Sequence, residues 1–479
     1  MPINLNTLTI KKAQDAFRSG EYTSRMLTEA VLAEAKKQNA DINAYAEIFD
    51  DALTLADAAD KRIKSGNIEP LTGIPVAIKD NMLYAGKEST SGSKILRGHI
   101  ATYSGAVVEK LLAQNAVIIG RTNMDEFAMG SSTETCAYGL VKNPIDTKRT
   151  PGGSSGGAAA ALSMDGALGT FGSDTGGSIR QPASFTGLVG LKPTYGAVSR
   201  SGLMSLASSF DQIGPFGKTV ADTKILYGAI AGYDSLDSTS VPNNHATRVT
   251  ATKKEKLTIG VPTDFINAEG IDEDVRERFR ATIAELKKAG HSILEIALPS
   301  LPKSLAAYYI IQPAEASSNL ARFDGIRYGF SKDAERLIDV YRQSRGEGFG
   351  KEARRRILLG TYVLSAGYYD AYYNKAVAVR RQITEELSAA FKKVDVIATP
   401  TAPSPAWRLG EKSADPMKMY LEDIFTVPAN IAGIPAISVP GESVVRDGVK
   451  LPTGIQFMAA AFQEDTLFQI ASAVEKIYE

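Results

Sequence analysis

The chain has 479 residues, of which 44% are hydrophobic and 23% are charged, values typical of a globular protein and not of a disordered one. Lys and Arg together number 54, as do Asp and Glu, so the formal net charge is zero and gives no general affinity for nucleic acid or an anionic membrane. The single cysteine, Cys136, excludes an internal disulfide and a cysteine-based metal site.

The N-terminal sequence bears on the location of the protein in the cell, and the three histidines limit its metal binding and its catalytic chemistry. No basic stretch with an apolar core opens the chain, and no uncharged apolar run reaches the about 18 residues of a membrane span, so we expect a cytoplasmic protein. His99, His245 and His291 are far apart and have no cysteine or carboxylate at metal-ligand spacing. We therefore expect no metal site and a catalysis that relies little on imidazole.

The first half of the chain predicts helices followed by alternating strands and helices. The first 60 residues read as helices, because Thr23 or Ser24 can cap a segment in which Leu27, Val31 and Ala35 recur at helical spacing. From about 71 to 222 the chain is rich in Gly, Ser and Thr, with short apolar runs of the β type. Strands are predicted at 74–78, 117–120, 167–171 and 188–191, and a helix at 107–114.

The second half continues this α/β pattern. The polar stretch 233–256 is predicted to be a surface connection, followed by a strand at 257–261 and a helix that Gly290 ends. Residues 301–391 read mostly as helix, and a helix at 466–478 closes the chain. Further strands are predicted at 394–399, 436–439 and 454–458. The elements favour one large α/β domain.

Two clusters of glycine and serine, 152–157 and 176–178, flank an Ala-rich segment that predicts a slim, closely packed helix. Backbone N–H groups in such turns can face an anion or a developing oxyanion, although two tight turns around a buried helix are an equally simple interpretation.

Three motifs compete for this region. Residues 152–156 fit the G-x-S-x-G elbow of α/β-hydrolases, with Ser154 as nucleophile and His245 or His291 as base. The run at 174–176 resembles half of an aspartic-protease dyad, but no second Asp-Thr-Gly occurs. A phosphate-binding loop is excluded because Ala158 and Ala159 stand where Lys and Ser or Thr are needed.

Serine chemistry without histidine needs another base, and Lys79 at the end of an apolar run is a candidate. A lysine with its ordinary pKa is neutral in only about one part in 10³ at pH 7, and partial burial at a strand end would lower that pKa. The alternative interpretation is a surface lysine paired with Asp80.

Four segments together resemble the amidase signature family. They are 73–80, 151–157, 172–182 and 190–196, and they follow the family's order and spacing. The resemblance implies one amidase domain over 1–479 with a central mixed β-sheet covered by helices on both faces. It also implies N-terminal helices over 1–65, the signature core over 70–220 and, over 257–479, the rest of the sheet with a helical glutamine-pocket region.

The resemblance implies a Ser-Ser-Lys triad and an oxyanion hole. Ser178 matches the nucleophile, Ser154 the relay and Lys79 the general base. The hole would be formed by backbone N–H groups, those of Thr175, Gly176, Gly177 and Ser178.

Within that family the chain is similar to the A subunits of aspartyl/glutamyl-tRNA amidotransferases. This similarity extends to segments outside the four named above, at residues 127–132, 314–325, 355–361, 367–373 and 423–428. This resemblance implies a glutaminase that supplies ammonia for converting Glu-tRNA(Gln) or Asp-tRNA(Asn) to Gln-tRNA(Gln) or Asn-tRNA(Asn). B and C subunits are the implied partners, with tRNA bound mainly through the B subunit, where ATP and Mg²⁺ are also expected. No cofactor is expected in this chain.

The glutamine pocket implied by the resemblance contains two charged residues. Free glutamine presents a carboxylate and an ammonium, which favour an arginine and an aspartate. The matching positions are Arg356 and Asp423, with Arg355 as a substitute for Arg356. Taken alone, these residues would read as a solvated helix face and a surface acid.

Two other functions remain open from the sequence. A stand-alone amidase acting on small amides would share the triad but have a mainly apolar pocket, and a non-catalytic assembly protein would not need Ser178.

Overall fold

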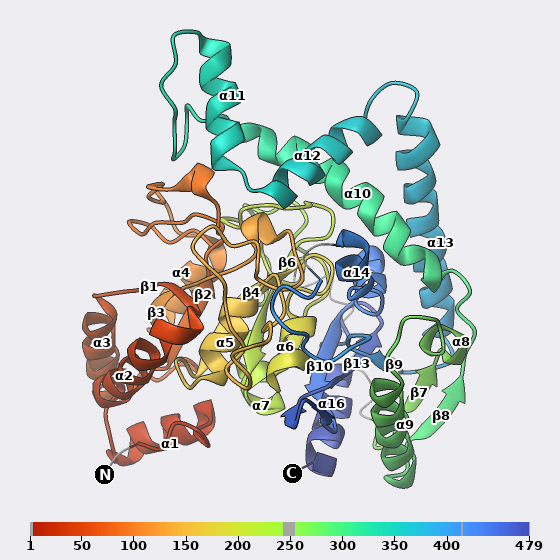
Figure 1. Ribbon diagram of the computed structural model, residues 1–479. Coiled ribbons are helices and arrows are strands. Elements are labelled where there is room, and N and C mark those ends of the chain that lie inside the picture. Colours follow the sequence, from red (N-terminus) through yellow and green to blue (C-terminus); the bar gives the residue numbers. More distant parts are fainter. Residues whose placement is uncertain (1–2, 243–253, 413–414, 479) are drawn as a thin grey trace.

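A sheet of 11 strands runs through the computed structural model, which describes residues 3–242, 254–412 and 415–478 (Figure 1). The strand order is β1-β3-β2-β4-β6-β5-β10-β13-β9-β7-β8, and a separate pair joins β11 to β12. The strands are β1 (Tyr45–Ile48), β2 (Pro75–Lys79), β3 (Val117–Thr122), β4 (Gly169–Asp174), β5 (Val189–Lys192), β6 (Gln212–Gly217), β7 (Thr258–Val261), β8 (Ser292–Glu295), β9 (Val396–Pro400), β10 (Ala436–Pro440), β11 (Val444–Arg446), β12 (Val449–Leu451) and β13 (Gly454–Ala459).

The sheet is mixed, as the resemblance implied. Strands β3, β2 and β4 are parallel to one another, as are β9, β7 and β8, whereas the strands between these two groups pair antiparallel. Because β2 and β4 are parallel neighbours, their carboxyl ends meet at one edge of the sheet, the edge where open α/β sheets place ligands.

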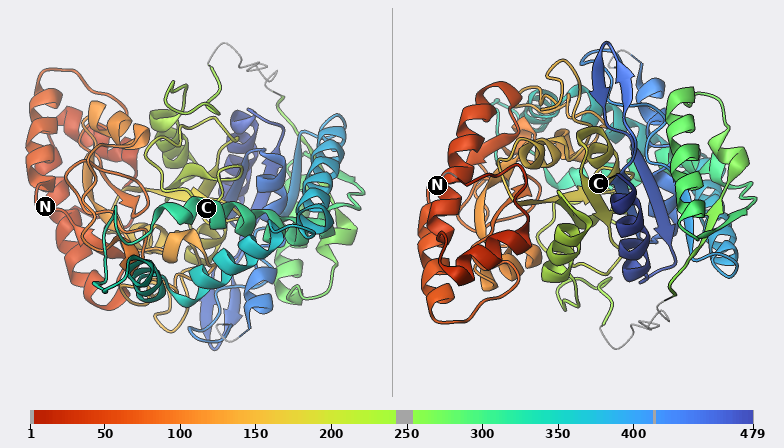
Figure 2. Two further views of the ribbon diagram at one scale, coloured as in Figure 1. Left: turned by 90° about the horizontal axis from the view of Figure 1, so that it is seen from above. Right: turned by 90° about the horizontal axis from the view of Figure 1, so that it is seen from below.

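Helices cover both faces of the sheet (Figure 2). On β4, a side chain at Gly169 would meet Leu226 of α7, while Thr170 donates a hydrogen bond to Ala158 of α5. Neighbouring residues of a strand point to opposite faces, so α5 and α7 lie on opposite sides. The helices are α1 (Ile10–Ser19), α2 (Ser24–Ile42), α3 (Ala52–Lys64), α4 (Ala106–Ala113), α5 (Gly156–Ser163), α6 (Arg180–Thr186), α7 (Val220–Ile230), α8 (Thr263–Ile266), α9 (Glu273–Lys288), α10 (Ser304–Asn319), α11 (Leu337–Gly348), α12 (Lys351–Val363), α13 (Lys375–Ala390), α14 (Pro416–Leu421), α15 (Val427–Ala432) and α16 (Glu464–Tyr478).

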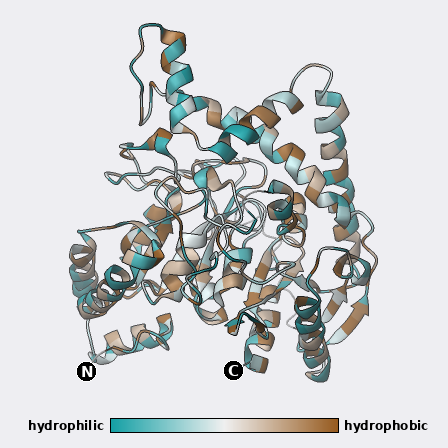
Figure 3. Cartoon of the chain, viewed as in Figure 1, coloured by the Kyte–Doolittle hydropathy of each residue, from teal (hydrophilic) through white to brown (hydrophobic). Residues whose placement is uncertain are grey.

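The outer helices are amphipathic, and Figure 3 shows hydrophilic and hydrophobic residues mixed along them. In α9, for example, Val275, Phe279 and Leu286 are buried at helical spacing while the charged residues between them face outward. In the described part of the chain, no helix is both long enough and apolar enough to cross a membrane.

Most predicted elements are present, but three strands of the large sheet and both strands of the pair β11 and β12 were missed. Strand β1 lies in a region predicted to be helical, and its register with β3 places Tyr45 opposite Thr122. Strand β6 contains two glycines and a proline, which disfavour strands, yet all its residues are buried between β4 and β5. Strand β8 is a short, mostly exposed edge strand. Of the predicted connection at 233–256, residues 243–253 lie outside the described residues.

In Figure 1, helices α10 and α12 lie above the central sheet, and α13 lies on the side of β7, β8 and β9. Helices α10 and α12 cross closely at Gly360, where a Cβ atom would lie 1.9 Å from the carbonyl oxygen of Pro313 and 2.9 Å from Ser317 Cβ. This crossing fixes the position of α12 over the sheet edge.

We expect Gly360→Ala to force the two helices apart and lower the free energy of unfolding by about 1–3 kcal/mol. Gly228→Ala is the matched control, because Gly228 is exposed in α7 with no atom within 4 Å of an added Cβ, and alanine favours a helix by up to about 1 kcal/mol. Denaturant unfolding measures the free energy of unfolding of both variants. Equal stabilities of the two variants would contradict the close crossing.

Candidate active site

Lys79 ends β2 as a fully buried side chain, whereas the sequence suggested partial burial at most. Its Nζ atom lies 2.7 Å from Ser154 Oγ, 2.8 Å from Ser155 Oγ and 3.0 Å from Ser173 Oγ. Asp80, the alternative partner considered above, instead pairs with Arg121 at 2.8 Å. The ammonium group therefore contacts hydroxyl groups and not a carboxylate.

Burial lowers the pKa of Lys79 to about 7, against the raising effect of the carboxylates of Asp125, Asp174 and Asp211. Removal of a cation from water disfavours its charged form, and no ion pair restores that form here. At pH 7 about half of the Lys79 side chains are thus neutral, compared with about one in 10³ for an ordinary lysine. A neutral amine beside a serine hydroxyl can accept its proton.

The turn that holds Ser154 is packed against the buried carboxylate of Asp125. A Cβ atom at Gly153 would lie 2.1 Å from Asp125 Oδ2, so only glycine fits at this position. The same carboxylate accepts hydrogen bonds from Thr133 N and Thr135 Oγ1, both at 2.8 Å. The peptide bond between Gly153 and Ser154 is cis. These contacts join the Ser154 turn to the loop 131–135.

Ser178 lies in the loop between β4 and α6, next to the Ser154 turn. The two segments touch where Ser155 N donates to Ser178 O at 3.2 Å. Within residues 3–242, 254–412 and 415–478, the Ser178 hydroxyl makes no hydrogen bond, and 7% of the residue is exposed. It is the least buried of the three predicted triad residues, as a group that receives a substrate needs to be.

The backbone amides predicted to form the oxyanion hole are not equivalent. Gly177 N donates to Asp174 Oδ1 at 2.9 Å, so this amide is occupied. Three of the four predicted donors then remain, those of Thr175, Gly176 and Ser178. Gly177 has a φ of 137°, a conformation that favours glycine.

A buried ion pair anchors this loop. Arg180 and Asp174 are both fully buried, and Arg180 donates to Asp174 at 2.9 and 3.0 Å. Although burial alone would raise the pKa of Asp174, the Arg180 guanidinium lowers it to about 2. Arg180 also donates to Thr426 O at 2.8 Å and to Asn430 Oδ1 at 2.6 Å. Short-range patterns did not reveal this network, because Thr426 and Asn430 lie more than 200 residues from Arg180 in the chain.

Arg356 on α12 is 4% exposed and lies against two aromatic rings, those of Tyr309 and Tyr420, at 5.3 and 5.2 Å from their centroids. Its Nε donates to Glu352 at 2.9 Å and its Nη1 to Gln312 Oε1 at 2.7 Å. Within the described residues its Nη2 makes no hydrogen bond, and Gln312 Nε2 is also buried without a partner. Two donors are therefore left for an anionic group.

Asp423 is 8% exposed and accepts hydrogen bonds from Tyr309 at 2.6 Å and Ser131 at 3.0 Å. Burial raises its pKa to about 7, against the lowering effect of both hydrogen bonds. Thr426, three residues on, donates to Gly176 O at 2.6 Å. Thr426 thus links Asp423 to the loop that carries Ser178, since its hydroxyl also contacts the carbonyl oxygen of Asp423.

Arg355 is linked to this cluster, because it shares the Glu352 carboxylate with Arg356. The Arg355 side chain is 39% exposed and pairs with Glu352. Burial raises the pKa of the Cys136 thiol to about 12. His291, a base considered for the elbow motif, accepts a hydrogen bond from Leu257 N at 3.1 Å far along the chain from Ser154, and His245 lies outside the described residues.

Two tyrosines of α10, Tyr308 and Tyr309, also contact this cluster. A Cβ atom at Gly176 would lie 2.7 Å from the Tyr308 ring, and the Tyr309 ring stacks on Tyr420 with centroids 3.9 Å apart. The two tyrosines therefore lie between the glycine loop and the Arg356–Asp423 pair.

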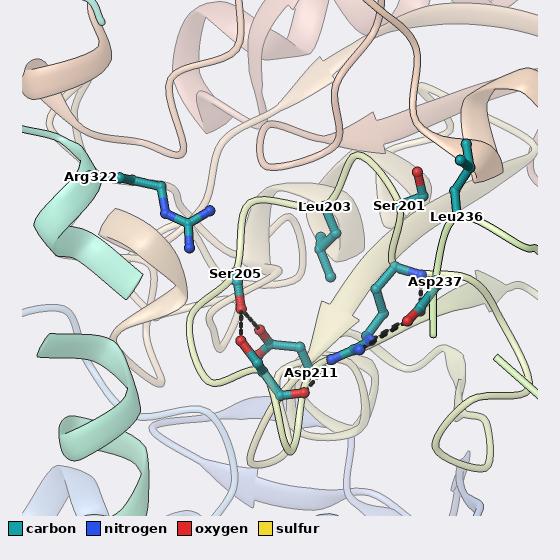
Figure 4. A pocket seen from close by; sticks show the side chains of 9 residues that line it. Ser201, Leu203, Ser205, Asp211, Leu236, Asp237 and Arg322 are labelled. Atoms are coloured by element: carbon teal, nitrogen blue, oxygen red, sulfur yellow. Dashed lines mark hydrogen bonds and ion pairs between the residues drawn. The ribbon is translucent and has the colours of Figure 1, made fainter. Parts of the chain in front are cut away.

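A separate open pocket of ≈ 210 Å³ lies beside Asp211 (Figure 4). Arg200 and Asp237 pair across its wall at 3.0 Å, and Arg322 faces it from the segment after α10. None of the predicted catalytic or substrate-binding residues lines this pocket. Asp211, one of its lining residues, accepts a hydrogen bond from Thr175 Oγ1 in the nucleophile loop at 2.7 Å.

Comparison with known proteins assigns the chain to a family. The family model described as Amidase matches residues 26–468. The A subunit of glutamyl-tRNA(Gln) amidotransferase from Syntrophus aciditrophicus is 50% identical over 99% of this chain and 98% of its own length. Its counterpart from Caldanaerobacter subterraneus is 49% identical over 100% and 98%.

Two solved structures support the same family assignment. The A subunit of glutamyl-tRNA(Gln) amidotransferase from Thermotoga maritima superposes with a TM-score of 0.79 at 39% identity, covering 99% of this chain and 95% of that one. Native peptide amidase from Stenotrophomonas maltophilia gives a TM-score of 0.82 at 28% identity, covering 98% and 96%. The chain belongs to the amidase family.

Proposed function

We propose that this chain is the glutaminase component of a tRNA-dependent amidotransferase. It hydrolyses glutamine and supplies the ammonia that converts Glu-tRNA(Gln) or Asp-tRNA(Asn) to Gln-tRNA(Gln) or Asn-tRNA(Asn). The observation that carries the proposal is a pair of buried residues of opposite charge, Arg356 and Asp423, of which Asp423 is linked through Thr426 to the loop of Ser178. Such a pair suits the carboxylate and ammonium of a free amino acid.

In the proposed reaction, Ser178 Oγ attacks the side-chain amide carbon of glutamine. Its proton passes to Ser154, whose own proton passes to neutral Lys79 over the 2.7 Å contact. When the C–N bond breaks, the proton returns from Lys79 through Ser154 to the leaving nitrogen, and ammonia departs. Water then hydrolyses the ester on Ser178, with Lys79 again accepting a proton, and releases glutamate.

The tetrahedral intermediate carries a negative charge on the former amide oxygen. We assign its stabilisation to the N–H groups of Thr175, Gly176 and Ser178, because Asp174 occupies the Gly177 amide. The glycines allow the backbone to approach the oxyanion without a side chain in between.

In the proposed pocket, Arg356 Nη2 and Gln312 Nε2 bind the α-carboxylate of glutamine, and ionised Asp423 binds its α-ammonium. Both donors lack partners within the part of the chain that the structure describes. A substrate would thus satisfy buried polar groups that are otherwise costly to leave unpaired.

The partners follow from the relatives, which are named as A subunits of an amidotransferase. We propose B and C subunits as partners, with no cofactor in this chain and with tRNA, ATP and Mg²⁺ bound mainly at the B subunit. The proposed setting is the cytoplasm. A stand-alone amidase acting on small amides remains the alternative, and it would leave the buried Arg356 and Asp423 without a role.

The function is tested by ammonia release from glutamine, measured on the chain co-purified with its partners. We expect release to rise with ATP and mischarged tRNA, and Ser178→Ala or Lys79→Ala to lower it by roughly 10³-fold or more. Ser184→Ala is the control, since Ser184 is buried in α6 away from Lys79. Fast turnover of a simple aliphatic amide by the lone chain, with glutamine ignored, would move the protein to the stand-alone amidases. Full-rate hydrolysis by Ser178→Ala would exclude the mechanism.

Recognition of the α-carboxylate of glutamine is tested by substituting each of two adjacent arginines, Arg355 and Arg356. We expect Arg356→Gln to raise the KM for glutamine roughly 10- to 100-fold, because a charge-assisted hydrogen bond contributes about 1.5–3 kcal/mol. Arg355→Gln should leave KM unchanged, since that side chain is partly exposed. Thermal unfolding of both variants checks the fold. A larger effect at position 355 than at 356 would contradict the pocket.

The two pKa values near 7 predict how the rate depends on pH. Lys79 must be neutral and Asp423 ionised, so both requirements fail as the pH falls below 7. In the free enzyme both groups titrate, and log kcat/KM for glutamine should rise with a slope approaching two below pH 7 and level off above it. In the substrate complex the ammonium keeps Asp423 ionised, so log kcat should rise with a slope of one. A kcat that is flat from pH 5 to 8 would exclude Lys79 as the base.

A further inference from the structure

One peptide unit of the nucleophile loop, between Gly176 and Gly177, is held at both of its polar atoms. Its carbonyl oxygen, on Gly176, accepts a hydrogen bond from Thr426 Oγ1 at 2.6 Å. Its N–H, on Gly177, donates to Asp174 Oδ1 at 2.9 Å. The two partners come from different parts of the fold, Asp174 from the end of β4 and Thr426 from the residue before α15.

A peptide unit between two glycines rotates easily, because neither residue has a Cβ atom to restrict it. Here a rotation by half a turn would point the carbonyl oxygen at the Asp174 carboxylate and the N–H at the Thr426 hydroxyl. The first of these contacts would place two hydrogen-bond acceptors together, which disfavours the rotated unit. The two hydrogen bonds therefore fix the plane of this unit.

The plane matters because the neighbouring peptide units share the Cα atoms of Gly176 and Gly177. The N–H of Gly176 precedes the fixed unit and the N–H of Ser178 follows it, and both are proposed donors to the oxyanion. Their directions are limited once the unit between them cannot rotate. Stabilisation of an oxyanion depends on donors that are already oriented before the charge develops.

Thr426 is itself rigidly placed. It is fully buried, and its carbonyl oxygen accepts a hydrogen bond from Arg180 at 2.8 Å. A Cβ atom at Gly177 would lie 2.3 Å from Thr426 Oγ1, so the hydroxyl packs directly on the glycine backbone. The same hydroxyl lies 3.2 Å from the carbonyl oxygen of Asp423.

We infer that Thr426 is a positioning residue for the oxyanion hole, which acts by holding the Gly176–Gly177 peptide unit through its hydroxyl group. The inference rests on the proposed glutamine hydrolysis. It assigns to Thr426 an effect on the transition state and none on the binding of glutamine.

The test compares Thr426→Val and Thr426→Ser in the full complex. Valine keeps the shape and removes the hydroxyl, so we expect kcat for glutamine to fall roughly 10- to 100-fold with KM within about twofold of wild type. Serine keeps the hydroxyl and should restore most of kcat. Thr401→Val is the matched control, because Thr401 is also buried and shares a hydrogen bond with Ser438 at 2.8 Å outside the site.

A second readout separates positioning from a general loss of structure. A boronic acid analogue of glutamine forms a tetrahedral adduct with the nucleophile, whereas glutamate binds as the product without one. Thr426→Val should weaken the boronate at least tenfold and glutamate by less than twofold. Equal weakening of both ligands, or an unchanged kcat in Thr426→Val, would overturn the inference. Wild-type complex that releases no ammonia from glutamine would instead count against the proposed function.

Discussion

A lysine ammonium buried without a carboxylate in contact is the constraint on which the site depends. Lys79 Nζ is surrounded by three serine hydroxyls, which are weak partners for a cation and good partners for a neutral amine. The carboxylates that act on Lys79 are engaged elsewhere, Asp174 with Arg180, and Asp125 and Asp211 with the hydroxyls of Thr135 and Thr175. Burial therefore lowers the pKa of Lys79 to about 7, and the chain obtains a base without a histidine.

The fold meets this constraint by bringing distant segments to one sheet edge. The parallel pair β2 and β4 places Lys79 and Asp174 at adjacent carboxyl ends. The loop after β4 carries Ser178, and the segment between β3 and α5 carries Ser154. Helices α10 and α12 supply Gln312 and Arg356 from above. Thr426 connects the glycine loop to the segment of Asp423, because its hydroxyl contacts the carbonyl oxygens of Gly176 and Asp423.

Short-range patterns in the sequence predicted an α/β fold and the local motifs, whereas the mixed sheet was implied by the resemblance to the amidase signature family. Glycine density at 152–157 and 176–178 pointed to close backbone approach, which the contacts at Gly153 and Gly177 show. The burial of Lys79 and the exposure of Arg355 could not be read from neighbours in the chain. The roles of Thr426 and Gln312 were also beyond prediction, since each acts on a partner 44 or more residues away.

The pKa of Lys79 is measured most directly by NMR on protein labelled with ¹³C at the lysine Cε position. Lys192 is a second buried lysine whose pKa burial lowers to about 7, so the signal is assigned by its loss in Lys79→Met and its retention in Lys192→Met. We expect a pKa near 7 for the Lys79 signal. A pKa near 10 would mean that the ammonium stays charged at pH 7, and Lys79 could then not serve as the base.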